Sequence, residues 1–343
     1  MIRLVSAWLF VVAVALPAAR AKADAMDLTL SRLRVPTSGA NLPAGCSAVG
    51  INGLPRDFCP DDDAWGRLVT ELSAVTLSTT PRPARTGGYG GFQLTFGGSM
   101  TQIRSDQSYW KLGTRGDQPT LGAENASPSS SLLTVMGELR KGLPFGFELG
   151  ATFGHVIDTS LWLVGGDLEW ALVEGGIEWF PDIAVRGTFR TLLGGADFSL
   201  FTPGVELIIS KPIAIGGSWV LTPLASWSLA WVIASTDVVD LTPDVNAVAE
   251  CQPDPSVSGT SCTFSGTLPD GRVPGQDFNN QAKFADYRAT RMRLTVGAEA
   301  RFAAFLLSGT FAFDLVPADA LSGGVPSGVA RQWTAMLATG VHF

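Results

Sequence analysis

The sequence predicts an all-β protein, an antiparallel transmembrane up-and-down β-barrel of about ten strands with a short N-terminal helix. Three observations predict this fold. The chain begins with an export signal, only 16% of its residues are charged while 46% are hydrophobic, and apolar and polar residues alternate over most of its length. A soluble exported protein would be expected to have about 25% charged residues, whereas the lipid-facing side of a membrane barrel is apolar.

The export signal is predicted over residues 1–23. A basic start precedes an apolar run at residues 4–16, and small residues close the segment, which are the three parts of a secretory signal peptide. The apolar run is shorter than the ~20 residues that a spanning helix needs. We therefore expect cleavage, for which the sites after Ala21, Ala23 or Ala25 all fit the pattern.

The strand alternation begins at Phe92 and continues to the C-terminus. Residues 145–153 alternate aromatic or aliphatic side chains with small or polar ones, and residues 162–172 and 292–302 repeat the pattern. Side chains with this period point to opposite faces of a strand. About ten segments fit a tilted bilayer crossing of ~9–11 residues, with eight or twelve as alternative counts. A secreted β-sandwich with one wet face is the alternative fold.

The polar faces of these strands carry acidic and basic residues in similar number. Charges enclosed in a narrow barrel can pair with one another, so we expect a stabilising network rather than a selectivity filter. Asp167 and Glu169 are expected to lie opposite Arg186 and Arg190 across one hairpin. The predicted lumen charges are Glu148, Asp167, Glu169, Arg186, Arg190, Glu206, Arg291, Arg293, Glu299 and Arg301.

Tryptophan spacing predicts where the barrel meets the membrane surface. Trp162 and Trp170 share one strand face, eight residues apart, and Trp219 and Trp227 repeat this spacing. At ~3.3 Å per residue the spacing covers roughly 26 Å along a strand, which suits the two aromatic girdles that border the apolar band of a barrel. The predicted girdle is Trp162, Trp170, Trp219, Trp227 and Trp231, with packing inside a sandwich as the alternative.

The last strand gives the most specific feature. Residues 333–343 end in Phe343, which shares a strand face with Leu337 and Val341. Together with the signal peptide, this segment resembles the C-terminal strand of bacterial outer-membrane β-barrel proteins, in which a terminal aromatic residue is a signal for the barrel-assembly machinery. The resemblance covers residues 89–343 in architecture. It implies an outer-membrane location, membrane lipid and the assembly machinery as partners, and Phe343 as the assembly signal.

An even number of strands places both ends of the chain in the periplasm, and long outer loops alternate with short periplasmic turns. The longest predicted loop, residues 235–285, is rich in acidic residues. Four cysteines in two local pairs of an exported chain indicate disulfides. Of the three possible pairings we expect Cys46–Cys59 with Cys251–Cys262, because short loops close easily. A metal site is not favoured, because no histidine cluster accompanies the cysteines.

Residues 24–88 form a separate N-terminal segment without strand alternation. Three aspartates at residues 61–63 precede a stretch with helical periodicity, so a helix is expected at about residues 64–75 with Leu68, Leu72 and Val75 on one face. This segment is expected either to enter the barrel mouth as a plug or to lie in the periplasm.

The composition limits the range of functions. The net charge of −7 offers no basic surface for nucleic acid, and we expect no cofactor, no metal and no enzymatic activity. A surface hydrolase built on His155 with Asp158 or Ser160 is the least favoured hypothesis. A ten-stranded lumen is narrow. The sequence therefore predicts a structural or surface-interaction protein with at most narrow passage of small solutes; a small-molecule channel is the alternative, and the oligomeric state is open.

Overall fold

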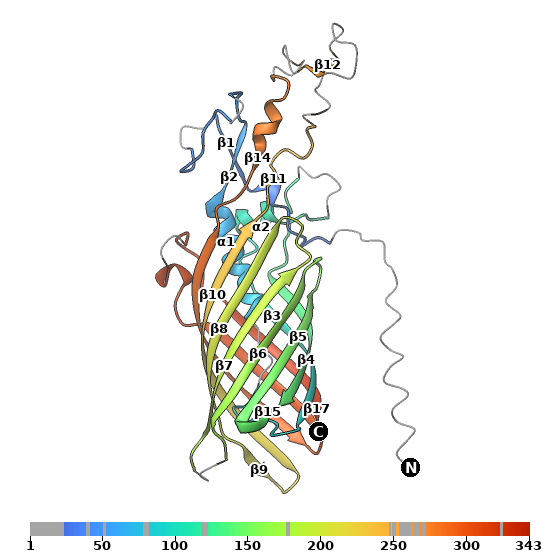
Figure 1. Cartoon of the computed structure of the whole chain (residues 1–343), viewed down its shortest axis with the longest axis vertical. Helices are drawn as coiled ribbons and strands as arrows, with labels where there is room; N and C mark the ends of the chain where they lie inside the picture. Colours follow the sequence, from blue (N-terminus) through green and yellow to red (C-terminus); the bar gives the residue numbers. More distant parts are fainter. Residues whose placement is uncertain are drawn as a thin grey trace, which may run out of the picture.

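Ten long antiparallel strands close into a barrel in the computed structural model (Figure 1). Neighbouring strands in the chain pair with each other, and the first barrel strand pairs with the last, so the predicted up-and-down barrel and its strand number are confirmed. The structure describes residues 24–343 except 39–41, 51–52, 78–81, 118–122, 176–178, 247, 249–251, 254–261, 264–267, 269–271 and 323–324.

The barrel strands are β3 (Phe92–Gln102), β4 (Ser131–Gly142), β5 (Phe147–Val156), β6 (Trp162–Val173), β7 (Asp182–Leu193), β8 (Phe198–Ser210), β10 (Trp219–Thr236), β15 (Tyr287–Phe302), β16 (Phe305–Asp314) and β17 (Trp333–His342). The helices are α1 (Asp62–Thr76), α2 (Ser108–Gly113) and the 3-10 turns η1 (Leu30–Arg32), η2 (Pro144–Gly146), η3 (Gln276–Asn280) and η4 (Ala318–Ala320). The short strands are β1 (Arg34–Pro36), β2 (Phe58–Pro60), β9 (Ile213–Ile215), β11 (Val239–Asp240), β12 (Gln252–Pro253), β13 (Cys262–Thr263) and β14 (Gln281–Ala282).

The two faces of each barrel strand differ sharply in burial and chemistry. On the inner face, polar and charged side chains such as Glu138 and Glu169 are buried. On the outer face, large apolar side chains are exposed: Phe153 at 57%, Leu168 at 47% and Phe311 at 42%. Soluble proteins rarely expose apolar patches of this extent. Polar side chains therefore lie inside and apolar ones outside, which is the reverse of an ordinary β-sandwich and is what the alternation predicts for a barrel.

The two ends of the barrel are built differently. At one end, called here the turn end, consecutive strands are joined by connections such as residues 303–304, and Ala303 adopts a left-handed conformation with φ of 51°. At the opposite loop end, the connections include residues 103–130 and 237–286. The termini of the barrel meet at the turn end, where the backbone amide of Phe92 donates to the carbonyl of Phe343 over 3.1 Å.

Two boundaries differ from the sequence prediction. The long loop begins after Thr236, because β10 stays paired with β8 up to that residue, and it ends before Tyr287, where β15 begins. The connection between β8 and β10 contains the short strand β9, which pairs with β10 as a continuation of β8. Pro212 lies at the interruption between β8 and β9, and proline has no backbone N–H to donate to a ladder.

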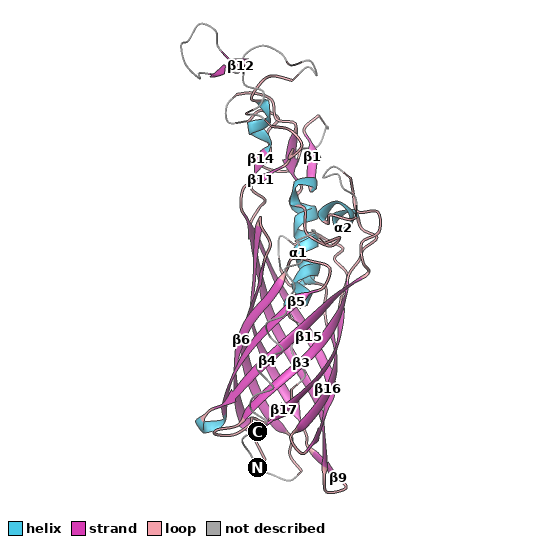
Figure 2. Ribbon diagram, turned by 90° about the vertical axis from the view of Figure 1, so that its right-hand side faces the viewer, coloured by secondary structure: helices cyan, strands magenta, loops and turns pink. Residues whose placement is uncertain are grey.

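The N-terminal helix α1 is inserted in the mouth of the barrel at the loop end (Figure 2). It begins two residues earlier than expected, since the Asp61 side chain accepts a hydrogen bond from the Ala64 amide at 2.9 Å and acts as the N-cap. Its buried side chains include Trp65, Leu68 and Leu72. No helix in the described part of the chain is long and apolar enough to cross a membrane.

Candidate functional site

The barrel lumen holds a dense group of ion pairs centred on Arg140 of β4. Its guanidinium lies 2.8 Å from an Asp167 oxygen, 3.4 Å from Glu148 and 3.8 Å from Glu169, and its Nε pairs with Glu138. All these side chains are at most 2% exposed. The four carboxylates come from three consecutive strands, so Arg140 joins β4, β5 and β6 from the inside.

Arg186 extends this network along the wall. Its Nε lies 3.3 Å from Glu169, which stands directly opposite in the β6–β7 register, and 3.5 Å from Glu206 of β8. The predicted pairing of Glu169 with Arg186 is thus present. Asp167 instead lies opposite Thr188 and pairs with Arg140, because Arg190 is two residues farther along β7.

A second group of charges lies on the other side of the lumen. Arg291 and Arg293 of β15 both pair with Asp314 of β16, with 3.2 Å between the Arg293 Nε and an Asp314 oxygen. Arg291 also donates to the Thr70 carbonyl of α1 over 2.5 Å. Nearer the turn end, Arg301 pairs with the fully buried Glu299. Each predicted lumen charge therefore faces the interior, with Arg301 the one that keeps 22% exposure.

The inserted helix α1 is tied to the lumen by polar contacts. Glu71, which is fully buried, accepts hydrogen bonds from the Tyr109 hydroxyl at 2.6 Å and from the Trp110 indole at 2.7 Å. Arg190 donates to the Thr76 carbonyl at the end of the helix over 3.3 Å. These contacts attach the helix both to the loop between β3 and β4 and to the barrel wall.

An aromatic and aliphatic cluster seals the helix against the strands. The Trp65 ring lies 6.0 Å from the Phe198 ring of β8 and 5.8 Å from Phe284. Leu68 and Leu72 belong to the same buried cluster. Directly below the helix, a cavity lined by Leu77, Arg190, Glu206 and Arg293 measures about 20 Å³, which is room for about one water molecule.

The chain leaves the helix toward the turn end, inside the barrel. Arg82 forms a buried ion pair with Glu148 at the start of β5, and the Ala84 amide donates to the Ser210 hydroxyl at the end of β8 over 2.9 Å. Arg85 then pairs with Asp182 at 3.2 Å. Since these partners lie at the turn end, residues 82–85 are held at the end of the lumen opposite the start of α1.

A vestibule opens at the turn end. It has a volume of about 320 Å³ and is lined among others by Pro83, Arg85, Arg301 and His342. Both arginines already have a carboxylate partner, Asp182 and Glu299 respectively. The lumen is therefore wide at its turn end and filled above it.

At and above the loop end, the described parts of residues 24–60 and of the loop at residues 237–286 lie side by side and are called here the cap module (Figure 1). The Asn280 side chain accepts hydrogen bonds from the amides of Asp57, at 3.0 Å, and Phe58, at 3.3 Å. The Arg56 Nε donates to the Asn279 carbonyl over 2.8 Å. The two segments are far apart in sequence, so the module exists only because the N-terminal segment ends up beside the loop.

One predicted disulfide is present in this module. Cys46 and Cys59 are bonded, with 6.2 Å between their Cα atoms. Cys59 lies in β2, which pairs with β1. The predicted Cys251–Cys262 bond lies outside what the structure describes, because Cys251 and the side chain of Cys262 are not described.

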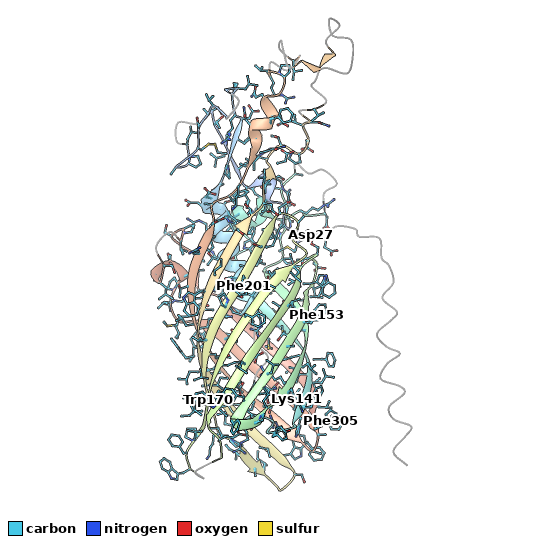
Figure 3. The ribbon with its side chains drawn as sticks, viewed as in Figure 1. Asp27, Lys141, Phe153, Trp170, Phe201 and Phe305 are labelled. Atoms are coloured by element: carbon cyan, nitrogen blue, oxygen red, sulfur yellow. A yellow bond between two sulfur atoms is a disulfide. The ribbon has the colours of Figure 1, made fainter. Side chains whose placement is uncertain are left out.

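The five predicted girdle tryptophans all lie on the outer face of the barrel. Trp170 stacks on Phe147 with 5.6 Å between ring centroids, and Trp219 packs beside Phe302 at 4.8 Å. Trp162 stacks on Phe153 at 5.0 Å. Figure 3 shows Trp170 near the turn end and Phe153 higher on the wall. Trp227 and Trp231 are 37% and 42% exposed on β10.

The candidate hydrolase residues each make their own contacts. His155 lies on the outer wall with its ring 4.5 Å from the Trp162 ring. The Asp158 carbonyl accepts a hydrogen bond from the Met26 amide, and the Ser160 hydroxyl donates to the Gly194 carbonyl over 3.3 Å. Among the described residues, no group of three or more His, Cys, Asp and Glu is placed to hold a metal ion.

Sequence reasoning missed part of the lumen network. Glu138, Arg140 and Asp314 stand on inward-facing positions of predicted strands, so their alternation could have found them. Glu71 and Arg82 lie in the segment that lacks this alternation. No pattern in the sequence distinguishes them from solvent-exposed charges.

Comparison with known proteins finds neither a protein-family description nor a curated protein sequence that matches the chain. Solved structures of bacterial outer-membrane barrels are similar at low scores. Ail of Yersinia pestis, solved with the heparin analogue sucrose octasulfate, has 7% identity and a TM-score of 0.25, covering 74% of this chain and 99% of Ail. The N-terminal barrel domain of Pseudomonas aeruginosa OprF has 12% identity and a TM-score of 0.26, covering 75% and 99%.

Neisserial surface protein A is similar to the same extent, with 10% identity, a TM-score of 0.25, and coverage of 74% of this chain and 99% of that protein. The likeness to these chains is slight. The barrel is defined by its own strand pairing, which closes between β3 and β17.

Proposed function

We propose that the protein is an integral outer-membrane barrel that is closed by its own N-terminal segment and acts through the cap module at the cell surface. The observation that carries this proposal is helix α1 in the barrel mouth, held by the buried contacts of Glu71 and Arg190. A closed lumen makes the barrel an anchor, and the part of the molecule left free to meet other molecules is the cap module.

The outer face of the barrel supports the membrane location. Exposed aromatic and aliphatic side chains surround the strands, including Phe96, Phe189 and Leu337 at 54–62% exposure. Exposing such an apolar surface to water is unfavourable in free energy, whereas the hydrocarbon layer of a membrane solvates it. Phe343 as an assembly signal and the barrel-assembly machinery as a partner are part of this proposal.

The two ends of the barrel give the orientation. Outer-membrane barrels have short periplasmic turns and longer extracellular loops. The turn end would face the periplasm, and the loop end, with α1 and the cap module, would face the exterior. In this orientation the N-terminal segment reaches the cell surface through the lumen, and Arg82 and Arg85 hold its last part near the periplasmic mouth.

Planar-bilayer recordings test the closed lumen. The full mature chain should insert without stable ohmic conductance steps, because the cavity below α1 holds about 20 Å³. A variant with Glu71→Ala and Arg190→Ala should show frequent openings, since it lacks two ties of the helix. Stable steps from the unaltered chain would overturn the closure and favour a small-molecule channel.

Protease treatment of intact cells tests the surface location. An added protease should cleave within residues 24–60 or 237–286, while the turn of residues 143–146 becomes accessible only after the outer membrane is permeabilised. Cleavage at that turn in intact cells would contradict the orientation. Absence of the protein from the membrane fraction would contradict the membrane location itself.

A further inference from the structure

The outer wall of the barrel carries an open apolar groove. It has a volume of about 510 Å³ and crosses strands β4 to β8 to reach β10. Its floor is made by small outward-facing residues, and larger ones form its sides. The floor residues are Ala151, Gly166, Gly187 and Pro203. The sides are formed by Leu139, Leu149, Leu168, Phe189 and Trp231.

The fold does not require one of the floor glycines. A Cβ atom added to Gly187 would meet no atom within 4 Å, and the backbone there is not in the left-handed region. A strand position of this kind accepts a larger side chain, and β-branched or aromatic residues are the usual choice in strands. Neither packing nor backbone conformation explains the glycine, but its lack of a side chain leaves the groove open.

Pro203 adds to the depression from the next strand. The pairing of β8 with β10 passes from Gly204↔Ala230 to Phe201↔Ile233, without a pair at Pro203, because proline has no N–H to donate. The Trp231 ring lines the groove beside this interruption. The groove is therefore formed by residues of several strands, and not by the absence of one side chain alone.

A basic side chain lies at the end of the groove nearest the turn end. Lys141 is exposed on the outer face of β4 and is one of the lining residues, and Figure 3 shows it low on the wall. Its ammonium donates to the Gly90 carbonyl over 2.9 Å. An ammonium group has three donors, so two stay available for an anionic group at the membrane surface.

We propose that this groove binds one acyl chain of an anionic phospholipid from the periplasmic leaflet, with the headgroup phosphate on Lys141. This inference rests on the proposed membrane location. Apolar side chains along the groove match the acyl chain, and the positive charge at its turn end matches the phosphate. A phospholipid offers these two features in the same order along the membrane normal.

Native mass spectrometry of the full mature chain in mild detergent, titrated with phosphatidylglycerol, tests this proposal. The unaltered protein should retain one phosphatidylglycerol. Gly187→Leu should reduce its affinity roughly tenfold, the effect of displacing about two buried methylene groups. Gly98→Leu is the matched control: Gly98 also faces outward, its added Cβ would approach no atom closer than 3.6 Å, and it does not line the groove.

Lys141→Gln tests the headgroup contact. The unaltered protein should prefer phosphatidylglycerol to the zwitterionic phosphatidylethanolamine, and Lys141→Gln should remove this preference while a lipid is still retained. Equal losses in Gly187→Leu and Gly98→Leu, or no retained lipid in the unaltered protein, would overturn the groove as a binding site. Failure of the protein to insert into phospholipid vesicles would instead refute the membrane location, so the two failures are distinguishable.

Discussion

Arg82 of the N-terminal segment and Glu148 of β5 form a buried ion pair inside the barrel, with both side chains at most 2% exposed. The Gly87 amide donates to the same carboxylate over 2.8 Å. Glu148 also lies 3.4 Å from Arg140 of the lumen network. The N-terminal segment is therefore part of the same electrostatic unit as the wall, and closure of the lumen and stability of the barrel are linked through Glu148.

Arg82→Ala should destabilise the protein by about 3–5 kcal/mol, the usual effect of removing one partner of a buried ion pair. The measurement is the temperature at which the compact, fast-migrating form disappears in heat-modifiable detergent gels. Lys283→Ala is the control, because its pair with Asp286 is more than half exposed and contributes only ~0–1 kcal/mol. Equal shifts for the two variants would contradict the role of Arg82.

Tyr109→Phe should loosen helix α1 without disturbing the barrel. It removes the 2.6 Å hydrogen bond to the buried Glu71 carboxylate, and hydrogen bonds to charged groups contribute ~1.5–3 kcal/mol. Limited trypsin digestion should cleave faster after Arg67, which lies within α1. If Tyr109→Phe leaves the cleavage rate at Arg67 unchanged but lowers the melting temperature of the barrel, the Tyr109–Glu71 hydrogen bond stabilises the barrel wall and not the helix.

The same contact predicts that the Tyr109 hydroxyl loses its proton only at a pH above the ordinary range for tyrosine. Burial, followed by the hydrogen bond to Glu71, raises the pKa of the Tyr109 hydroxyl above its ordinary value. Its contribution to stability is therefore fully present below pH ~10 and is lost as the pH rises through the higher folded-state pKa. In a tyrosinate absorbance titration, Tyr109→Phe should remove a late step. Loss of signal near pH 10 in that variant would contradict the prediction.

Arg140→Met should be more damaging than any other single change in the lumen network. It leaves four buried carboxylates without their shared cation, and like charges in a low-dielectric interior repel strongly. The gel assay should show a large loss of thermal stability or no folded barrel. A second change, Asp167→Asn, should recover part of the loss by removing one charge. A double variant no better than Arg140→Met would argue against charge repulsion as the cause.

Reduction of the Cys46–Cys59 disulfide should affect the cap module alone. Closing a loop of this length, 13 residues in sequence separation, stabilises by about 3 kcal/mol in chain-entropy terms. Cys46→Ser with Cys59→Ser should speed proteolysis within residues 24–60 and leave the heat-modifiable migration of the barrel unchanged. A parallel loss of barrel stability would show that the module and barrel fold as one unit.

The sequence by itself determined the barrel. Period-two alternation sets which side chains face each side of a strand, so the inward position of Glu169 and the outward position of Leu168 follow from sequence order alone. A strand number near ten and the chain order of the hairpins follow from the same local patterns, with eight or twelve strands left open. The helix near residues 64–75 follows from its own periodicity and from the aspartates at its start.

Tertiary structure alone decided where the N-terminal segment goes and which charges pair. The insertion of α1 depends on Trp65 meeting Phe198, and the pairing of Asp167 with Arg140 rather than Arg190 depends on strand register and side-chain reach. These contacts join residues more than twenty positions apart and carry no local periodicity. The groove at Gly187 arises in the same way, because its depth depends on small residues that four different strands bring together.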